Sequence, residues 1–115
     1  MLNDSLLLDR AFQALADPAR RDMLERLAQG PATVSELGRP LPMSLPAVLQ
    51  HLKVLEESGL VRSTKQGRIR TCRIEPAAFA AAYTWIAEQR AIWEARLDRF
   101  EDYLATLTNP ETNDG

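Results

Sequence analysis

Few side chains in this 115-residue chain are of the types that catalyse reactions or bind metals. It contains one histidine, His51, and one cysteine, Cys72. One thiol cannot form an intramolecular disulfide or a multi-thiolate zinc site, and His51 has no second histidine with which to hold a metal. We therefore expect no metal and no cofactor, and we expect His51 either to contact a phosphate or to form a buried structural hydrogen bond.

Arrangements typical of catalysis are also missing from the sequence pattern. There is no Ser/His/Asp set with supporting spacing, no glycine-rich phosphate loop and no pair of carboxylates in a plausible cleft. An enzyme is therefore disfavoured.

Cys72 allows two interpretations. Because Arg70 and Arg73 flank it, its thiol could have a lowered pKa and react with oxidants or form an intersubunit disulfide. Free cysteine also behaves as a small buried hydrophobe. The second interpretation is favoured.

The charge distribution points to nucleic acid. Residues 39–73 hold seven Lys or Arg and two Glu, a net charge of +5, whereas the rest of the chain carries −7 and the whole chain −2. Phosphate backbones attract such a basic region, although a solvated charged face is the alternative. Within it, Gln50 has an amide that can pair with adenine. The cationic candidates for phosphate or minor-groove contact are Lys53, Lys65, Arg68 and Arg70.

Capping signals predict the elements that carry these residues. Apolar residues recur on one helical face over residues 4–16. Asp17 is a good N-cap, and Pro18 then stands at the first position of a second helix, which Gly30-Pro31 closes.

The next two helices have their own start signals. Thr33 and Glu36 form a capping box for a short helix, Val34–Gly38. Ser44 can cap a fourth helix over residues 44–58. The proline in the first turn of this helix is tolerated, because backbone amides there have no partner within the helix. Residues 60–74 then predict a β-hairpin, with strands 60–65 and 68–74 around a glycine turn.

A last helix begins at Glu75-Pro76 and has an apolar stripe with steps of three and four. The stripe consists of Phe79, Tyr83, Ile86, Arg90, Trp93, Leu97, Phe100, Leu104 and Leu107. A helix of about 30 residues is about 45 Å long, more than a small domain covers. Coiled-coil-like self-association is favoured over folding back on the same domain. We expect one domain over residues 1–108 and a frayed polar tail over residues 109–115.

This order of elements predicts a mainly α fold with a small β-hairpin, a winged helix-turn-helix, whose fourth helix enters the major groove. Ser44 and the helix amides can reach a phosphate there, and Leu45 and Ala47 can touch a thymine methyl group.

The sequence resembles the ArsR family of bacterial winged-helix repressors. The residues that carry the resemblance are Leu15-Ala16-Asp17-Pro18-Ala19-Arg20-Arg21, Thr33-Val34-Ser35-Glu36-Leu37, the stretch from Ser44 to Val61, and Gly67-Arg68. The resemblance implies a homodimer that binds an inverted-repeat operator and blocks transcription. It also implies DNA contacts from the wing arginines and from Ser44, Leu45, Pro46, Ala47, Gln50 and His51.

The same resemblance implies pairing through the first and last helices, for which the candidate interface residues are Leu7, Phe12, Tyr83, Ile86, Trp93, Leu97, Phe100 and Leu104. Metal-sensing members place paired cysteines on the third helix or Asp and His ligands on the last helix. Here the third helix has no thiol and the last has no histidine, so a member of the non-metal-sensing type is expected. Leu49 stands where many relatives carry serine.

The leading hypothesis is therefore a dimeric DNA-binding repressor. The alternative is a winged-helix module that binds another protein through its long final helix. No transmembrane segment and no secretory signal are recognised, so a cytoplasmic location is expected.

Overall fold

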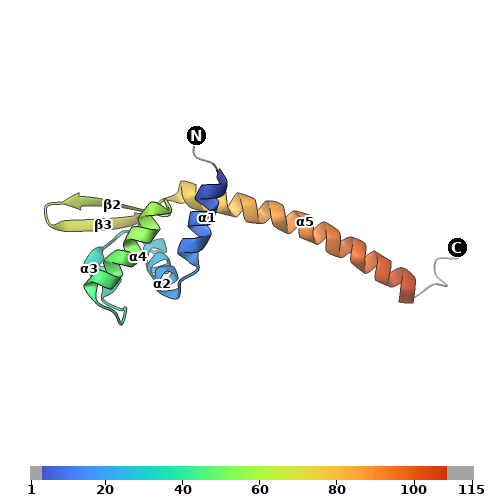
Figure 1. Cartoon of the computed structure of the whole chain (residues 1–115), viewed down its shortest axis with the longest axis horizontal. Coiled ribbons are helices and arrows are strands. Elements are labelled where there is room, and N and C mark those ends of the chain that lie inside the picture. Colours follow the sequence, from blue (N-terminus) through green and yellow to red (C-terminus); the bar gives the residue numbers. More distant parts are fainter. Residues whose placement is uncertain (1–3, 109–115) are drawn as a thin grey trace. The chain divides into compact units, whose positions relative to one another are not determined.

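The computed structural model describes residues 4–108, and the predicted tail at 109–115 lies outside the described residues. The chain is mostly helical with a small antiparallel sheet, as the sequence predicted (Figure 1). The elements are α1 (Asp4–Leu15), α2 (Pro18–Ala28), β1 (Ala32–Thr33), α3 (Val34–Gly38), α4 (Leu45–Glu57), β2 (Val61–Gln66), β3 (Ile69–Ile74) and α5 (Pro76–Thr108). None of these helices is long and apolar enough to cross a membrane.

The predicted caps are formed. The Asp17 carboxylate accepts a hydrogen bond from the Arg20 backbone N–H at 3.1 Å and starts α2. Thr33 and Glu36 form the complete capping box of α3, with bonds of 3.2 and 2.9 Å. Ser44 caps α4. Each cap satisfies amide groups that a helix start leaves without partners.

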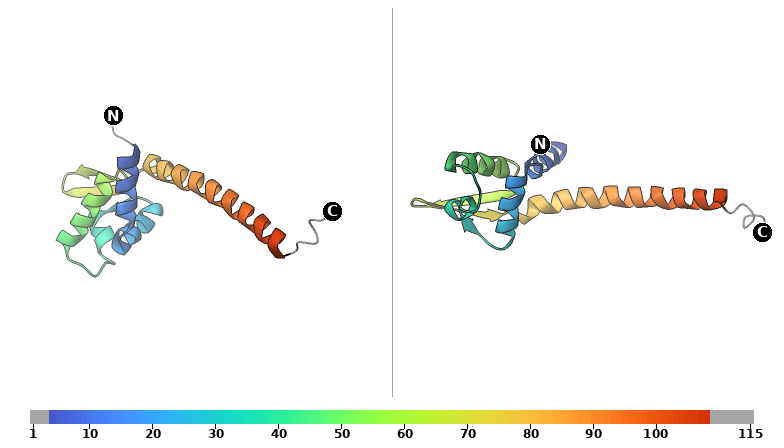
Figure 2. Two further views of the ribbon diagram at one scale, coloured as in Figure 1. Left: turned by 45° about the vertical axis from the view of Figure 1, so that its right-hand side comes forward. Right: turned by 90° about the horizontal axis from the view of Figure 1, so that it is seen from below.

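The sheet has one strand more than the predicted hairpin. Its order is β1-β3-β2, and Ala32 pairs with Cys72. Two residues are too few to show the alternation that identifies a strand, so β1 could not be recognised in the sequence. The β2–β3 hairpin projects beyond α3 and α4 (Figures 1 and 2). Gly67 supplies the positive φ of 64° that its turn requires.

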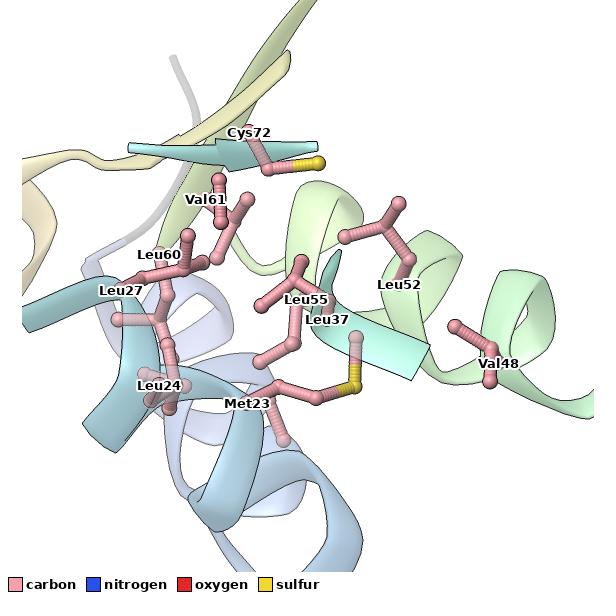
Figure 3. Close-up of a cluster of buried hydrophobic side chains, with 13 residues drawn as sticks. Met23, Leu24, Leu27, Leu37, Val48, Leu52, Leu55, Leu60, Val61 and Cys72 are labelled. Atoms are coloured by element: carbon pink, nitrogen blue, oxygen red, sulfur yellow. The ribbon is translucent and has the colours of Figure 1, made fainter. Parts of the chain in front are cut away.

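One face of α4 belongs to the core. Val48, Leu52 and Leu55 are at most 1% exposed and pack with side chains of α2 and the sheet, including Met23 and Cys72 (Figure 3). Their steps of four and three residues along the chain are the sequence pattern of a helix with one buried face. Val54 is also half-buried against the core.

The contacts divide the chain between Ala82 and Tyr83. In the first unit, the start of α5 is packed, since Phe79 lies against the core and Ala82 is 5% exposed. In the second unit, every described residue over 83–108 is exposed except Gln89, which is half-buried. That both units act together as a single domain over residues 1–108 stays a prediction.

Replacing Leu55 with alanine is expected to lower the free energy of unfolding by about 2–5 kcal/mol, because a fully buried leucine leaves a cavity in a core that relaxes only partly. Urea titration at fixed protein concentration measures this. The control is Leu45→Ala on the same helix, where the side chain is 59% exposed and the change should stay within about 0.5 kcal/mol. Equal losses in the two variants would contradict the placement of the core face.

Candidate nucleic-acid interface

The residues predicted to contact DNA from α4 lie away from its core face. Five of them are exposed, namely Ser44, Leu45, Pro46, Gln50 and Lys53. Ala47 and His51 are half-buried. The N-terminal half of α4 therefore offers a hydroxyl, an amide and apolar groups to solvent at the positive end of the helix dipole.

A groove of about 640 Å³ joins this part of α4 to the hairpin. Its α4 side consists of Leu45 and Leu49, and Val34 begins the α3 side. The hairpin side brings three of the predicted DNA contacts together: Lys65, Arg68 and Arg70. Helix α4 and the hairpin thus border one groove that is lined by both apolar and cationic side chains.

The positive charge on the hairpin is not neutralised by the protein. Lys65 and Arg70 are paired residues of neighbouring strands, so two like charges stand opposite each other. Within residues 4–108, neither they nor Arg68 form an ion pair; Arg62, by contrast, lies 3.0 Å from Glu75. Such an arrangement favours an external anion near the hairpin.

Sequence reasoning missed two apolar residues of the groove. Leu49 is 40% exposed and Ile69 is 59% exposed at the end of the hairpin. A large apolar side chain between two arginines in a solvent-exposed hairpin was a usable signal, because nothing local could bury it. These residues can contact sugar or thymine methyl groups at the same site.

One ring nitrogen of His51, Nδ1, contacts Arg20 and Asp17 of the same chain. This nitrogen lies 3.2 Å from Nη1 of Arg20 and 3.8 Å from Oδ2 of Asp17. The Arg20 backbone N–H, with the nearby His51 as a lesser influence, holds the pKa of Asp17 below its ordinary value. Of the two interpretations offered for His51, the structural hydrogen bond is therefore present.

Comparison with known proteins agrees with this geometry. A family model described as a helix-turn-helix domain matches residues 15–64. The HTH-type transcriptional regulator Rv2034 of Mycobacterium tuberculosis is 53% identical over 76 residues, which are 66% of this chain and 71% of that protein. The crystal structure of the ArsR family transcriptional regulator RHA00566 has a TM-score of 0.75 and 52% identity, covering 82% of this chain and 97% of the other. The chain belongs to the ArsR family of transcriptional regulators.

A further neighbour is the homodimeric winged helix-turn-helix DNA-binding domain Mb0332 of Mycobacterium bovis, solved by NMR. It has a TM-score of 0.59 and 27% identity, and the match covers 75% of this chain and 82% of the other. The winged helix-turn-helix predicted for this ArsR-family chain is thus confirmed.

The predicted dimer-interface residues are mostly exposed in the single chain. On α1, Leu7 is 39% exposed and Phe12 is half-buried. On α5, those over residues 83–108 are 41–73% exposed: Tyr83, Ile86, Trp93, Leu97, Phe100 and Leu104. Arg90, the polar member of the same stripe, pairs with Glu94 at 2.7 Å. An apolar stripe of this length facing water is typical of an interaction surface.

Within residues 4–108, no three His, Cys, Asp or Glu side chains come together in a way that could hold a metal ion. A second groove, of about 550 Å³, is largely apolar, with Arg21 and Glu25 as its charged residues. That groove offers no nucleophile or acid–base pair.

Cys72 is buried, and the less favoured of its two interpretations, in which the flanking arginines lower the pKa of its thiol, is wrong. Its side chain is 0% exposed in the core. Burial, reinforced by the negative charge of Glu56, raises the pKa of the thiol to about 11, and Arg70 offsets this only in part. The desolvation of the thiolate outweighs the arginine that is near in sequence. The small-hydrophobe interpretation is correct.

We expect the folded protein to react with a disulfide reagent near pH 8 at least about a hundredfold more slowly than the unfolded chain, because little of the thiol is ionised and it is enclosed. The single cysteine gives one rate. Since the folded pKa is raised, the contribution of the thiol to stability is complete below its ordinary pKa of 9.0 and falls as the pH rises towards about 11. Equal reaction rates with and without denaturant would contradict this burial.

Proposed function

We propose that this ArsR-family protein is a homodimeric repressor that binds an inverted-repeat operator and blocks transcription. The observation that carries the proposal is the groove in which α4 and the hairpin meet, because its uncompensated cations border the exposed start of a helix-turn-helix recognition helix. In this arrangement α4 enters the major groove and the β2–β3 hairpin acts as the wing.

The α4 residues have different roles in DNA binding, which follow from the chemistry of their side chains. Ser44 and the first amides of α4 face a phosphate, an arrangement that the helix dipole favours. Gln50 reads adenine through its amide, and Leu45, Pro46 and Ala47 form the apolar surface beside it. Lys53 is free to reach the backbone, because its contact with Glu57 is 4.0 Å long between side chains that are 68% and 61% exposed.

The wing residues supply affinity rather than sequence discrimination. Lys65, Arg68 and Arg70 contact phosphates or the edge of the minor groove beside the site read by α4. Each neutralised phosphate releases counterions, so these contacts weaken as salt rises.

Dimerisation through α1 and α5 places two such units on one operator. The homodimeric neighbour and the exposed stripe on α5 support it. The steps of three and four along α5 are those of coiled-coil packing, and a two-fold symmetric dimer matches an inverted repeat. Leu7 and Phe12 would complete the interface from α1.

We infer further that this member does not sense metal and has no enzymatic role. Its single histidine already uses Nδ1 within the protein, and its single thiol is buried and protonated. A metal ligand must be deprotonated and accessible. Such a repressor acts in the cytoplasm, where bacterial DNA is found.

Gln50→Ala is expected to weaken binding to the best operator by about 1–3 kcal/mol and to leave binding to unrelated duplex DNA nearly unchanged. The operator is obtained by selecting bound duplexes from a random pool, and affinities follow from fluorescence anisotropy. Gln29→Ala is the matched control, because Gln29 is exposed at the end of α2. Equal losses on both kinds of DNA would show that Gln50 only positions the protein.

Leu97→Glu is expected to weaken the dimer at least tenfold, because it places a charge in the apolar stripe, whereas Ala95→Glu lies outside the steps of three and four and should have little effect. Sedimentation equilibrium measures both variants beside the wild type. A wild type that is monomeric at micromolar concentration, or that co-purifies only with another protein, would favour the protein-binding alternative.

A further inference from the structure

Arg20 joins the end of α1 to the recognition helix. Its Nε donates to the carbonyl of Ala14 at 2.8 Å, and its Nη2 donates to the carbonyl of Gln13 at 3.1 Å. Both carbonyls belong to the last turn of α1, where helical hydrogen bonding ends. The guanidinium is planar, so these two bonds fix the direction of the third donor, Nη1, which faces Nδ1 of His51 at 3.2 Å.

This contact determines where the neutral His51 ring carries its proton. Arginine has only donors and stays protonated, so the nitrogen that it faces has to accept. The proton of a neutral imidazole is then on Nε2. Asp17 competes weakly for Nδ1, because its Oδ2 is 3.8 Å away and already accepts from the Arg20 backbone N–H at 3.1 Å.

The protonated nitrogen reaches the surface. No residue within 4–108 forms a hydrogen bond with Nε2, and no buried side-chain nitrogen or oxygen in that range lacks a partner. Nε2 is therefore accessible to solvent, although the side chain as a whole is only 22% exposed. An N–H group fixed in direction on the recognition helix suits a phosphate oxygen, which only accepts.

We infer that Arg20 is a positioning residue for DNA binding: it holds His51 in the Nε2–H tautomer, so that the ring donates a hydrogen bond to a DNA phosphate. This inference rests on the proposed function, since it assigns a partner to one residue of the same interface. Both interpretations of His51 then apply: Nδ1 accepts the structural hydrogen bond from Arg20, and Nε2–H contacts the phosphate.

The first test is the tautomer. The chain has one histidine, so a long-range ¹H–¹⁵N spectrum of the full-length protein contains a single imidazole. At a pH where the ring is neutral, we expect a protonated Nε2 and a bare Nδ1 in the wild type. Arg20→Met keeps an apolar stem and removes every donor, and it should raise the population with the proton on Nδ1, facing Asp17.

Arg21→Met is the matched control for this spectrum. Arg21 also donates to the end of α1, through a 2.7 Å bond to the carbonyl of Leu15, and no hydrogen bond links it to α4 within the described residues. A purely structural role for Arg20 predicts similar results for both variants. Our inference predicts that only Arg20→Met changes the His51 spectrum and the affinity for DNA.

The second test separates the two ring nitrogens by DNA affinity. His51→Asn offers an acceptor near the position of Nδ1 and no donor at Nε2, so it should weaken operator binding about tenfold or more over the two copies. His51→Gln keeps a donor near Nε2 and should stay within about threefold of the wild type. Arg20→Met should weaken operator binding as much as His51→Asn does. The double variant that carries both substitutions should bind only slightly more weakly than either single variant.

Failures of the two proposals are distinguishable. A wild type that binds no duplex overturns the proposed function and with it any DNA role of Arg20. A wild type that binds DNA but carries the His51 proton on Nδ1 overturns this inference alone, as does an equal affinity of His51→Asn and the wild type. If Arg20→Met does not fold, the wild-type spectrum and the two His51 variants still decide.

Discussion

The burial of one face of α4 is the constraint on which the rest of the structure depends. Val48, Leu52 and Leu55 are at most 1% exposed, and each stabilises the fold by about 1.5–3 kcal/mol. Rotating α4 to present another face would expose all three, at a cost comparable with the whole stability of a small domain. The core therefore decides which side chains face the solvent, and Arg20 contacts the same helix at His51.

The positive charges of the hairpin lower its own stability, but they favour the binding of an anionic partner. Opposed like charges on the hairpin, Lys65 and Arg70, weaken an isolated two-stranded ribbon. The remaining chain is acidic, so the protein as a whole carries −2. The positive charge gathered around the groove attracts phosphate, which disfavours docking in other orientations.

The sequence predicted the parts of the fold that have local causes. Three helix starts were predicted from their N-cap residues, Asp17, Thr33 and Ser44, each of which bonds to a backbone amide three residues later. The spacing of apolar residues along α4 likewise indicates its buried face. The Arg20–His51 contact joins residues 31 positions apart and has no local signal. Cys72 shows the same limit, because its pKa is set by burial in the core rather than by the arginines beside it in the chain.

The central claim is that the solvent face of α4 and the hairpin cations together bind duplex DNA, and the salt dependence of affinity tests it most directly. We expect the three hairpin cations of each chain to contact about six phosphates in a dimer. These contacts alone predict a slope of about −5 for the logarithm of affinity against the logarithm of salt concentration on B-DNA, and Lys53 makes it steeper. Removing one hairpin cation per chain should make that slope shallower by about two. An affinity that does not change with salt, or a slope unaffected by the loss of Arg68, would contradict the account.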